Sequence, residues 1–374
     1  MSNLTKQRYL ADRKVELNEL FFDLIFVYAI SKIAHTILHV HHGSVSIELF
    51  LKYLIMTLIF TTIWSYQTFF TNRFGTLALR DIGFTMFNMF VVIYLSNSLY
   101  PDFEKTFFPF VLSTGILFLS ISLQYFIRNV SSEDIEDKNV CNVFSITTLT
   151  AGILSLIALC LPLSIHYYVY FLAIGISMIG PLAGYRHLSA SPVNMPHLVE
   201  RYGLLTIIMF GEVMIGLASI FSIHHFDPMT ILQFTIVVLL FWTYWIKTEQ
   251  FMNHHQMTRG FLLYHSHIII FLALGMFNAG MVLSENPDIN DWFKIVLMYG
   301  SLTLYFIGYF VNFPYFHDHH KNRQLIISIM MILIVGFIVA VVLRLVPHSL
   351  TIITTIVMIV IFLLVRQQKL QSNI

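Results

Sequence analysis

Residues 16–26, "ELNELFFDLIF", begin the first long apolar run of the chain and place three carboxylates at its start. Such a run is long enough for a helix to cross roughly 30 Å of hydrocarbon. Similar runs recur along all 374 residues, of which 57% are hydrophobic and 11% charged. Ordinary soluble domains contain about 25% charged residues. The composition therefore predicts an all-α fold, a polytopic transmembrane helical bundle.

Counting the apolar runs predicts twelve transmembrane helices. The expected ranges are 17–38, 47–70, 80–99, 107–127, 140–161, 165–185, 198–221, 229–247, 262–283, 292–313, 324–345 and 349–365. The break between the fifth and sixth spans rests on Pro162 and the polar His166, because proline interrupts a helix.

The basic residues predict the orientation of these helices. With the N-terminus on the cytoplasmic side, sixteen Lys and Arg residues, Lys247 included, fall on that side and three fall outside. This asymmetry is the positive-inside pattern, and it predicts that both termini are cytoplasmic. Residues 1–16 and 367–374 are then cytoplasmic tails, and the first of them lacks the cleavage site of a signal peptide.

Short recurring motifs suggest two parallel six-helix halves, 17–185 and 186–366. The pattern W-x-Y occurs in the second and eighth spans, and "MFN" occurs in the third and ninth. The first and seventh spans both open on an acidic residue, Glu19 and Glu200. Short matches also arise by chance in aromatic-rich sequence, so the repeat stays a hypothesis.

The carboxylates of the opening stretch lie on one helix face, because Glu16, Glu19 and Asp23 fall within about 60° of each other. For Glu16 and Glu19, we interpret the charge mainly as capping of a helix N-terminus. Asp23 lies deeper among aromatic residues and requires an inward-facing partner, for which Arg80 and Arg201 are candidates. The sequence leaves open whether Asp23 forms a structural ion pair or part of a site.

Glu212 interrupts the apolar seventh span and must face the bundle interior. Gly211 and Gly216 flank it and would admit another helix or water. His197, Arg201 and Glu212 share one helix face. A carboxyl in such a site can carry a proton, and the alternative is a protonated Glu212 that only donates an interhelical hydrogen bond.

Further polar side chains lie inside predicted spans. Lys32 lies deep in the first span, and we expect a buried partner for it, either Glu212 or Asp23. Protonation of such a partner would break the pair, as proton-coupled transport requires. Asn88 and Asn278 would line a polar path or form ordinary interhelical hydrogen bonds.

One histidine and one tryptophan inside the predicted spans also have possible roles. His267, near the inner end of the ninth span, is a candidate for a proton path. Trp64 is interpreted as a span-end anchor or a packing aromatic.

Two segments resemble a known family. "VELNELFFDLIFVYAISKIAH" (15–35) and "HLVERYGLLTIIMFGEVMIGL" (197–217) are similar to the two signature segments of the bacterial low-temperature-requirement A (LtrA) family. The chain length and the number of spans also fit. The resemblance implies a bacterial inner-membrane protein linked to growth at low temperature. It implies no substrate, cofactor or mechanism.

A membrane enzyme with histidine-bound iron is an alternative, because the chain contains 17 histidines. Its histidine clusters occur at 35–42, 223–226, 253–256, 264–267 and 316–320. The predicted orientation places His42 and His225 outside but His255 and His319 inside, so one metal centre cannot bind both sets. We expect no catalytic residue, metal or cofactor, and the chain lacks the GxxxxGK[ST] motif of ATP hydrolysis.

These observations favour secondary transport of a small solute or ion, coupled to protons. Glu212 is the predicted coupling carboxyl, with Asp23, Lys32, Arg201 and Arg80 as charge partners. The alternatives are an ion channel and an intramembrane enzyme acting on lipids. The expected partners are membrane lipids and the solute or ion. A net charge of +1 does not suggest nucleic acid, and a homo-oligomer is left open.

Overall fold

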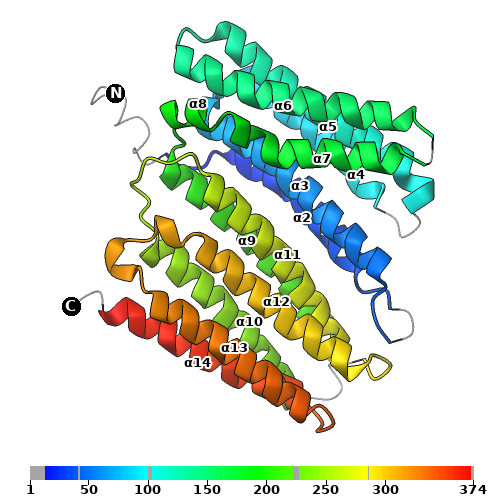
Figure 1. Ribbon diagram of the computed structural model, residues 1–374, viewed down its shortest axis with the longest axis vertical. Coiled ribbons are helices and arrows are strands. Elements are labelled where there is room, and N and C mark those ends of the chain that lie inside the picture. The colour runs from blue at the N-terminus through cyan, green and yellow to red at the C-terminus, as the bar shows by residue number, and fades with distance from the viewer. Residues whose placement is uncertain are drawn as a thin grey trace. The chain divides into compact units, whose positions relative to one another are not determined.

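The computed structural model describes residues 13–40, 43–99, 103–162, 164–221, 227–284 and 286–371. These residues are mostly helical (Figure 1), and the only β pairing within the described ranges is an isolated bridge between Met252 and Phe316. The predicted all-α fold is confirmed.

Twelve helices of at least 18 residues occur in the described part of the chain, and each coincides with one predicted span. They are α2 (Leu17–Thr36), α3 (Ile47–Phe74), α4 (Leu79–Asn97), α5 (Phe103–Ser131), α6 (Ile135–Leu159), α7 (His166–Ala183), α9 (Met195–Ser219), α10 (Pro228–Ile246), α11 (Phe261–Ser284), α12 (Asp291–Val311), α13 (Arg323–Val342) and α14 (Ser349–Gln371). The break around Pro162 is present as predicted. The short α8 (Tyr185–Ala190) and a π-helical turn, η1 (Lys247–Phe251), were not predicted.

Local sequence fixes where several helices begin. The side chains of Asp134, Asp227, Asn290 and Asn322 each accept a hydrogen bond from the backbone N–H two residues further on. Short polar side chains at this position satisfy a backbone donor that the helix itself leaves without a partner. Pro228, which follows Asp227, fits the first helical position because its missing N–H is not needed there.

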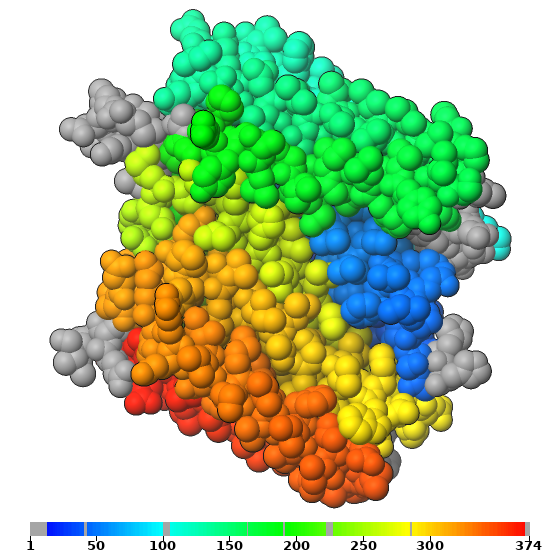
Figure 2. All heavy atoms as spheres, in the orientation of Figure 1, coloured from blue at the N-terminus to red at the C-terminus, as the bar shows by residue number. Residues whose placement is uncertain are grey.

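Eleven of the helices in the described ranges are long and apolar enough to cross a membrane. The remaining long helix, α2, differs because its 20 residues include Glu19, Asp23 and Lys32. Large apolar side chains of α13, among them Ile327 and Met331, are exposed, which suits a lipid environment. In Figure 2, α12 and α13 (orange) form much of the visible face of their part of the chain. The protein is therefore a multi-pass membrane protein.

The chain divides into two compact units. Unit 1 comprises the described residues of Met1–Ile33, Ile55–Arg201 and His255–Gly260, and unit 2 comprises those of Ala34–Leu54, Tyr202–His254 and Phe261–Ile374. In unit 1, α5 packs against α4 and α6, and α6 packs against α7. In unit 2, α11 packs against α12, α12 against α13, and α14 against α10 and α13. Unit 1 contains Glu16, Glu19 and Asp23, the three carboxylates near the start of α2.

Candidate functional site

The start of α9 positions two residues of the site. The Asn194 side chain accepts a hydrogen bond of 3.1 Å from the backbone N–H of His197, and Pro196 lies in the first turn. This cap fixes the start of the helix. His197 and Arg201, four residues apart, then lie on one face. Glu19 and Asp23 have the same spacing on α2, so each helix presents two ionisable side chains along one stripe.

The two stripes meet in a buried charge cluster made of Glu19, Asp23, His197 and Arg201. The Arg201 guanidinium lies 3.2 Å from a Glu19 oxygen through Nη1 and 2.7 Å from Asp23 Oδ1 through Nη2. His197 Nε2 lies 3.0 Å from the other Glu19 oxygen. None of the four residues is more than 3% exposed. Of the two arginines considered as partners of Asp23, the structure brings Arg201 to it.

Trp64 of α3 completes the surroundings of Asp23. Its indole Nε1–H donates a 2.7 Å hydrogen bond to Asp23 Oδ1, and the Arg201 guanidinium carbon lies 5.5 Å from the indole ring centroid. Trp64 is fully buried, which fits the packing aromatic of the two interpretations offered above and not the span-end anchor. A buried indole needs a hydrogen-bond acceptor, and a guanidinium over its face gains cation–π attraction. The site thus joins α2, α3 and α9.

The hydrogen bonds around Asn72 define the protonation state of His197. The backbone N–H of Asn194 donates to Asn72 Oδ1 at 3.0 Å, which identifies that atom as the amide oxygen. Asn72 Nδ2 must therefore be the donor toward His197 Nδ1, 3.0 Å away, and it also donates to the Asn194 carbonyl. Because Nδ1 accepts, the proton of the imidazole lies on Nε2 and is donated to Glu19. In this arrangement His197 is neutral.

The two carboxylates differ in their hydrogen bonds. Both Glu19 oxygens have a nitrogen close by: Oε1 forms an ion pair with Arg201 Nη1 at 3.2 Å without a hydrogen bond, and Oε2 accepts from His197 and from the backbone N–H of Glu16. Asp23 Oδ1 accepts from Trp64 and Arg201, whereas the buried Asp23 Oδ2 has no hydrogen-bond partner among the described residues. Glu19 therefore fits the ionised form, and Asp23 has room for one more hydrogen.

Charge balance points to the same atom. With His197 neutral, two ionised carboxylates and one guanidinium would give the buried cluster a net charge of −1. An uncompensated buried charge is costly, and a buried group commonly becomes neutral instead. One proton on Asp23 Oδ2 would neutralise the cluster and leave the other contacts in place. The arrangement can thus store and release a single proton.

A polar cavity of about 200 Å³ reaches the Glu19 edge of the cluster. The residues that line it are Arg13, Glu16, Asn18, Glu19, Thr71, Gly75, Thr76, Leu77, Asp81 and Thr85. This volume is large enough for several water molecules. Water in this cavity could therefore exchange protons with the cluster through Glu19.

A row of polar side chains extends from this cavity into the bundle. Thr85 lines the cavity, and the Gln67 amide donates to its hydroxyl over 3.5 Å. The Asn88 amide in turn donates to the Gln67 oxygen at 3.1 Å. Asn88 is 1% exposed, and its bond to Gln67 joins α4 to α3, which is the interhelical hydrogen bond given above as one of its two expected roles. Gln67 was not singled out in the sequence, because one amide in a span has many explanations.

The structure places two of the predicted charge partners, Arg80 and Lys32, and the candidate Glu200 away from the cluster. Arg80 is partly exposed and its Nε lies 3.3 Å from Asp81, and Glu200 is exposed. Lys32 is exposed with Nζ 5.5 Å from the Tyr28 ring centroid, contrary to the expectation that it is buried. The reason is geometric: nine residues separate it from Asp23, which places the two side chains about 180° apart around α2.

Glu212 and Asn278 lie in unit 2. Glu212 is 7% exposed on α9, so its predicted inward orientation agrees with the structure. One turn further along α9, Gly216 lies directly against the side-chain amide of Asn278 on α11. The predicted close approach of another helix thus occurs at Gly216, whereas a Cβ on Gly211 would meet nothing within 4 Å.

A second buried polar group in unit 2 surrounds His267. Its Nδ1 lies 2.7 Å from the Leu263 carbonyl and its Nε2 lies 2.9 Å from the Tyr244 hydroxyl. Lys247 is fully buried nearby, with Nζ 4.4 Å from the Tyr244 ring centroid and 5.7 Å from that of Tyr309. No hydrogen-bond partner for this ammonium occurs among the described residues.

The position of Lys247 was not foreseen from the sequence. A lysine at the end of a predicted span was counted as an ordinary inner-side charge. The signal in the sequence was the largely apolar run that leads directly up to Lys247, with Tyr244 about one helical turn before it.

The histidine-rich segments show no metal centre in the described ranges. No group of three or more His, Cys, Asp or Glu side chains there is arranged to hold a metal ion. His41, His42, His224 and His225 lie outside the described residues.

Comparison with known proteins identifies the family of the chain. Residues 14–363 match the model of a family described as bacterial low temperature requirement A protein (LtrA). A search of curated proteins gave no significant match. A search of solved structures gave none either. The family match covers more than nine-tenths of the chain, including every residue of the charge cluster, and the protein therefore belongs to the LtrA family.

Proposed function

We propose that this protein is a proton-coupled secondary transporter of a small solute or ion, and that Asp23 is its coupling carboxyl. The observation that carries the proposal is the buried Asp23 Oδ2, which has no hydrogen-bond partner in the described residues, whereas Glu19 Oε1 has the Arg201 guanidinium at 3.2 Å and Glu19 Oε2 is hydrogen-bonded. A buried ionisable group inside a membrane protein marks a functional site more often than a structural one.

The cycle follows from the contacts of Arg201. When Asp23 is ionised, Arg201 faces two carboxylates and the cluster has an excess negative charge. When Asp23 takes up a proton, its attraction for the guanidinium weakens because the charge-assisted bond becomes a bond to a neutral acid. The position of α9 relative to α2 then depends on the proton. A dependence of this kind is what couples proton movement to a change between two conformations.

Glu212 remains the second candidate for the coupling group. It is nearly buried on α9, eleven residues after Arg201. We favour Asp23 for two reasons. Its Oδ2 has no hydrogen-bond partner in the described residues and can hold a proton, and loss of that proton would strengthen its contact with Arg201. The two positions are separable by mutation, since one lies on α2 and the other on α9.

For the location of the protein we propose the bacterial cytoplasmic membrane, with both termini inside. The positive-inside pattern supports this orientation. A second cavity of about 200 Å³, lined by Arg13, Arg73 and Arg128, lies in unit 1 and fits a cytoplasmic end that attracts anions. A reporter fused to the C-terminus that is active only in the cytoplasm tests the orientation, and an inactive but folded fusion would contradict it.

The proposed function is tested with purified protein in liposomes that contain a pH-sensitive dye. Ions and small solutes are screened for proton-linked flux with wild type, Asp23→Asn and Glu212→Gln, and folding is checked for each. Asn at position 23 keeps the size of the side chain and its acceptor for Trp64 but cannot ionise. We expect solute-dependent proton movement in wild type and its loss, by at least about tenfold, in Asp23→Asn.

Other outcomes assign the function differently. Proton movement lost only in Glu212→Gln would transfer the coupling role to that residue. Large single-channel currents in place of saturable flux would identify a channel. Absence of flux with every solute would contradict transport.

A further inference from the structure

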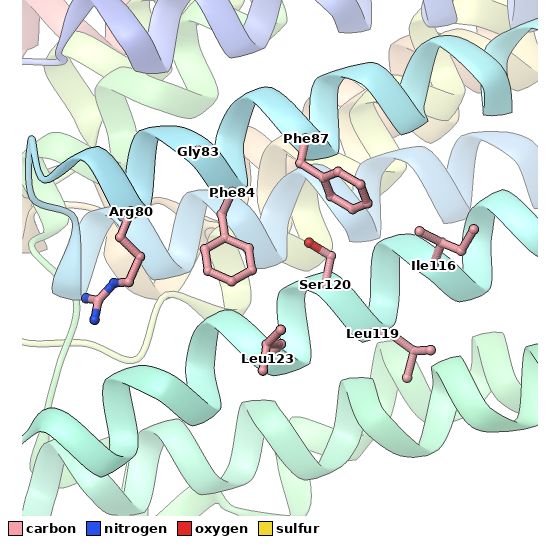
Figure 3. A pocket seen from close by; sticks show the side chains of 8 residues that line it. All are labelled: Arg80, Gly83, Phe84, Phe87, Ile116, Leu119, Ser120 and Leu123. Atoms are coloured by element: carbon pink, nitrogen blue, oxygen red, sulfur yellow. The ribbon is translucent and has the colours of Figure 1, made fainter.

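A groove in unit 1 lies between α4 and α5 and is separate from the charge cluster. Its volume is about 470 Å³, and apart from Arg80 and Ser120 its lining is apolar. In Figure 3 the rings of Phe84 and Phe87 extend from α4 toward α5, with Arg80 beyond them at one end. Seven residues separate Arg80 from Phe87, so the groove follows the helix for about 10 Å.

The Arg80 guanidinium is available at the end of this groove. Its side chain is 42% exposed, and in the described residues its hydrogen bonding is limited to Nε with Asp81 at 3.3 Å. Asp81 is itself engaged by the hydroxyl and backbone N–H of Thr76. The two terminal nitrogens of Arg80 therefore remain as donors. Their planar arrangement suits the oxygens of a phosphate.

Two features of the groove favour an incoming molecule: empty space at Gly83 and a hydroxyl without a partner at Ser120. A Cβ on Gly83 would meet nothing within 4 Å, so this glycine leaves empty space next to Phe84 and Phe87. Ser120 is 7% exposed and its hydroxyl, directed toward α4 in Figure 3, has no hydrogen-bond partner among the described residues. A buried hydroxyl without a partner is unfavourable. An incoming molecule with an acceptor, such as an ester carbonyl, would satisfy it.

From this geometry we infer that the groove binds one anionic phospholipid, with an acyl chain along Phe84 and Phe87 and the phosphate on Arg80. The apolar lining fits a hydrocarbon chain, the Ser120 hydroxyl fits the ester region, and the cation at the end fits the headgroup. Arg80 lies at the start of α4, the end predicted to face the cytoplasm, where anionic lipids attract basic residues. This site depends on neither Asp23 nor the transport activity.

Native mass spectrometry of the delipidated protein in detergent tests this inference. The protein is titrated with phosphatidylglycerol or with phosphatidylcholine of identical acyl chains. The variants are Arg80→Gln, Gly83→Leu and, as a matched control, Arg186→Gln, which removes an exposed arginine from α8. Circular dichroism confirms that each variant keeps its helices.

We expect wild type and Arg186→Gln to bind phosphatidylglycerol more tightly than phosphatidylcholine. Arg80→Gln should lose about fivefold in that preference, the effect of one basic residue at a membrane surface. Gly83→Leu should weaken both lipids, because the added side chain fills the space for the acyl chain. An unchanged preference in Arg80→Gln, or unchanged binding of both lipids in Gly83→Leu, would overturn the inference.

Discussion

Asp23 and Glu19 are both carboxylates on one face of α2, and their hydrogen bonds assign them different tasks. Glu19 receives two donors on Oε2 and an ion-pair contact with Arg201 on Oε1, whereas Asp23 receives two donors on Oδ1 and none from the described residues on Oδ2. The difference originates in Asn72, which orients His197 toward Glu19. A residue that touches neither carboxylate thus determines which of them can hold the proton.

Replacement of Asn72 by leucine should destabilise the protein. The change removes the acceptor of the Asn194 backbone N–H and the donors to the Asn194 carbonyl and His197 Nδ1. Each buried polar group left without a partner costs about 1–3 kcal/mol. We expect a clearly lowered melting temperature in detergent by scanning fluorimetry. Asn97→Leu, at an exposed asparagine of α4, serves as the control, and an equal effect of both changes would contradict the role of Asn72.

Replacement of Lys247, unlike that of Asn72, should stabilise the protein. Its fully buried ammonium faces two tyrosine rings and has no hydrogen-bond partner in the described residues. Cation–π attraction is worth about 2 kcal/mol when desolvated, less than the several kcal/mol that a buried ion costs. Lys247→Met, which keeps the length of the side chain, should therefore raise the melting temperature. The exposed Lys321→Met should change it little, and a lower melting temperature in Lys247→Met would show that the ammonium has a stabilising partner.

At the scale of elements, the packing of α12 against α11 depends on one glycine. A Cβ on Gly308 would lie 2.9 Å from the Ser266 carbonyl oxygen and 3.1 Å from the Ile270 nitrogen, and backbone atoms cannot move aside. Gly300, on the same helix, has nothing within 4 Å of such a Cβ. Small residues at helix contacts allow this close approach in membranes.

The two glycines provide a matched pair of variants. Gly308→Ala should destabilise the protein by about 1–3 kcal/mol through overpacking. Gly300→Ala should be neutral or stabilising, because alanine favours a helix by about 1 kcal/mol over glycine. Melting temperatures of both variants test this, and equal values would show that α11 and α12 do not approach as closely as described.

The helices themselves could be predicted from the sequence because hydrocarbon forces backbone groups to pair within each segment. Hydropathy therefore located all twelve long helices, and Pro162 gave the break between α6 and α7. The candidate site was only partly predictable. Spacing along one helix placed Glu19 with Asp23 and His197 with Arg201. No such rule links Trp64 or Asn72 of α3 to α2 and α9, because those contacts join residues distant in sequence.

At the scale of the whole molecule, the protein buries a few ionisable groups within bundles of apolar helices. Unit 1 contains the charge cluster and unit 2 contains the Lys247 and His267 group. Buried ionisable groups are expensive in a membrane protein, and the proposed proton-coupled transport gives the charge cluster a use that stability alone does not. This view requires a carboxyl that is protonated inside the folded protein at neutral pH.

The most direct measurement is infrared spectroscopy of the folded protein at neutral pH, which distinguishes a carboxylic acid from a carboxylate by its carbonyl stretch. Wild type, Asp23→Asn and Glu19→Gln are compared after hydrogen–deuterium exchange. We predict a buried carboxylic-acid band in wild type that disappears in Asp23→Asn and persists in Glu19→Gln. A spectrum in which Asp23→Asn removes no such band would show that Asp23 is ionised, and this would contradict the proposal that Asp23 carries the proton.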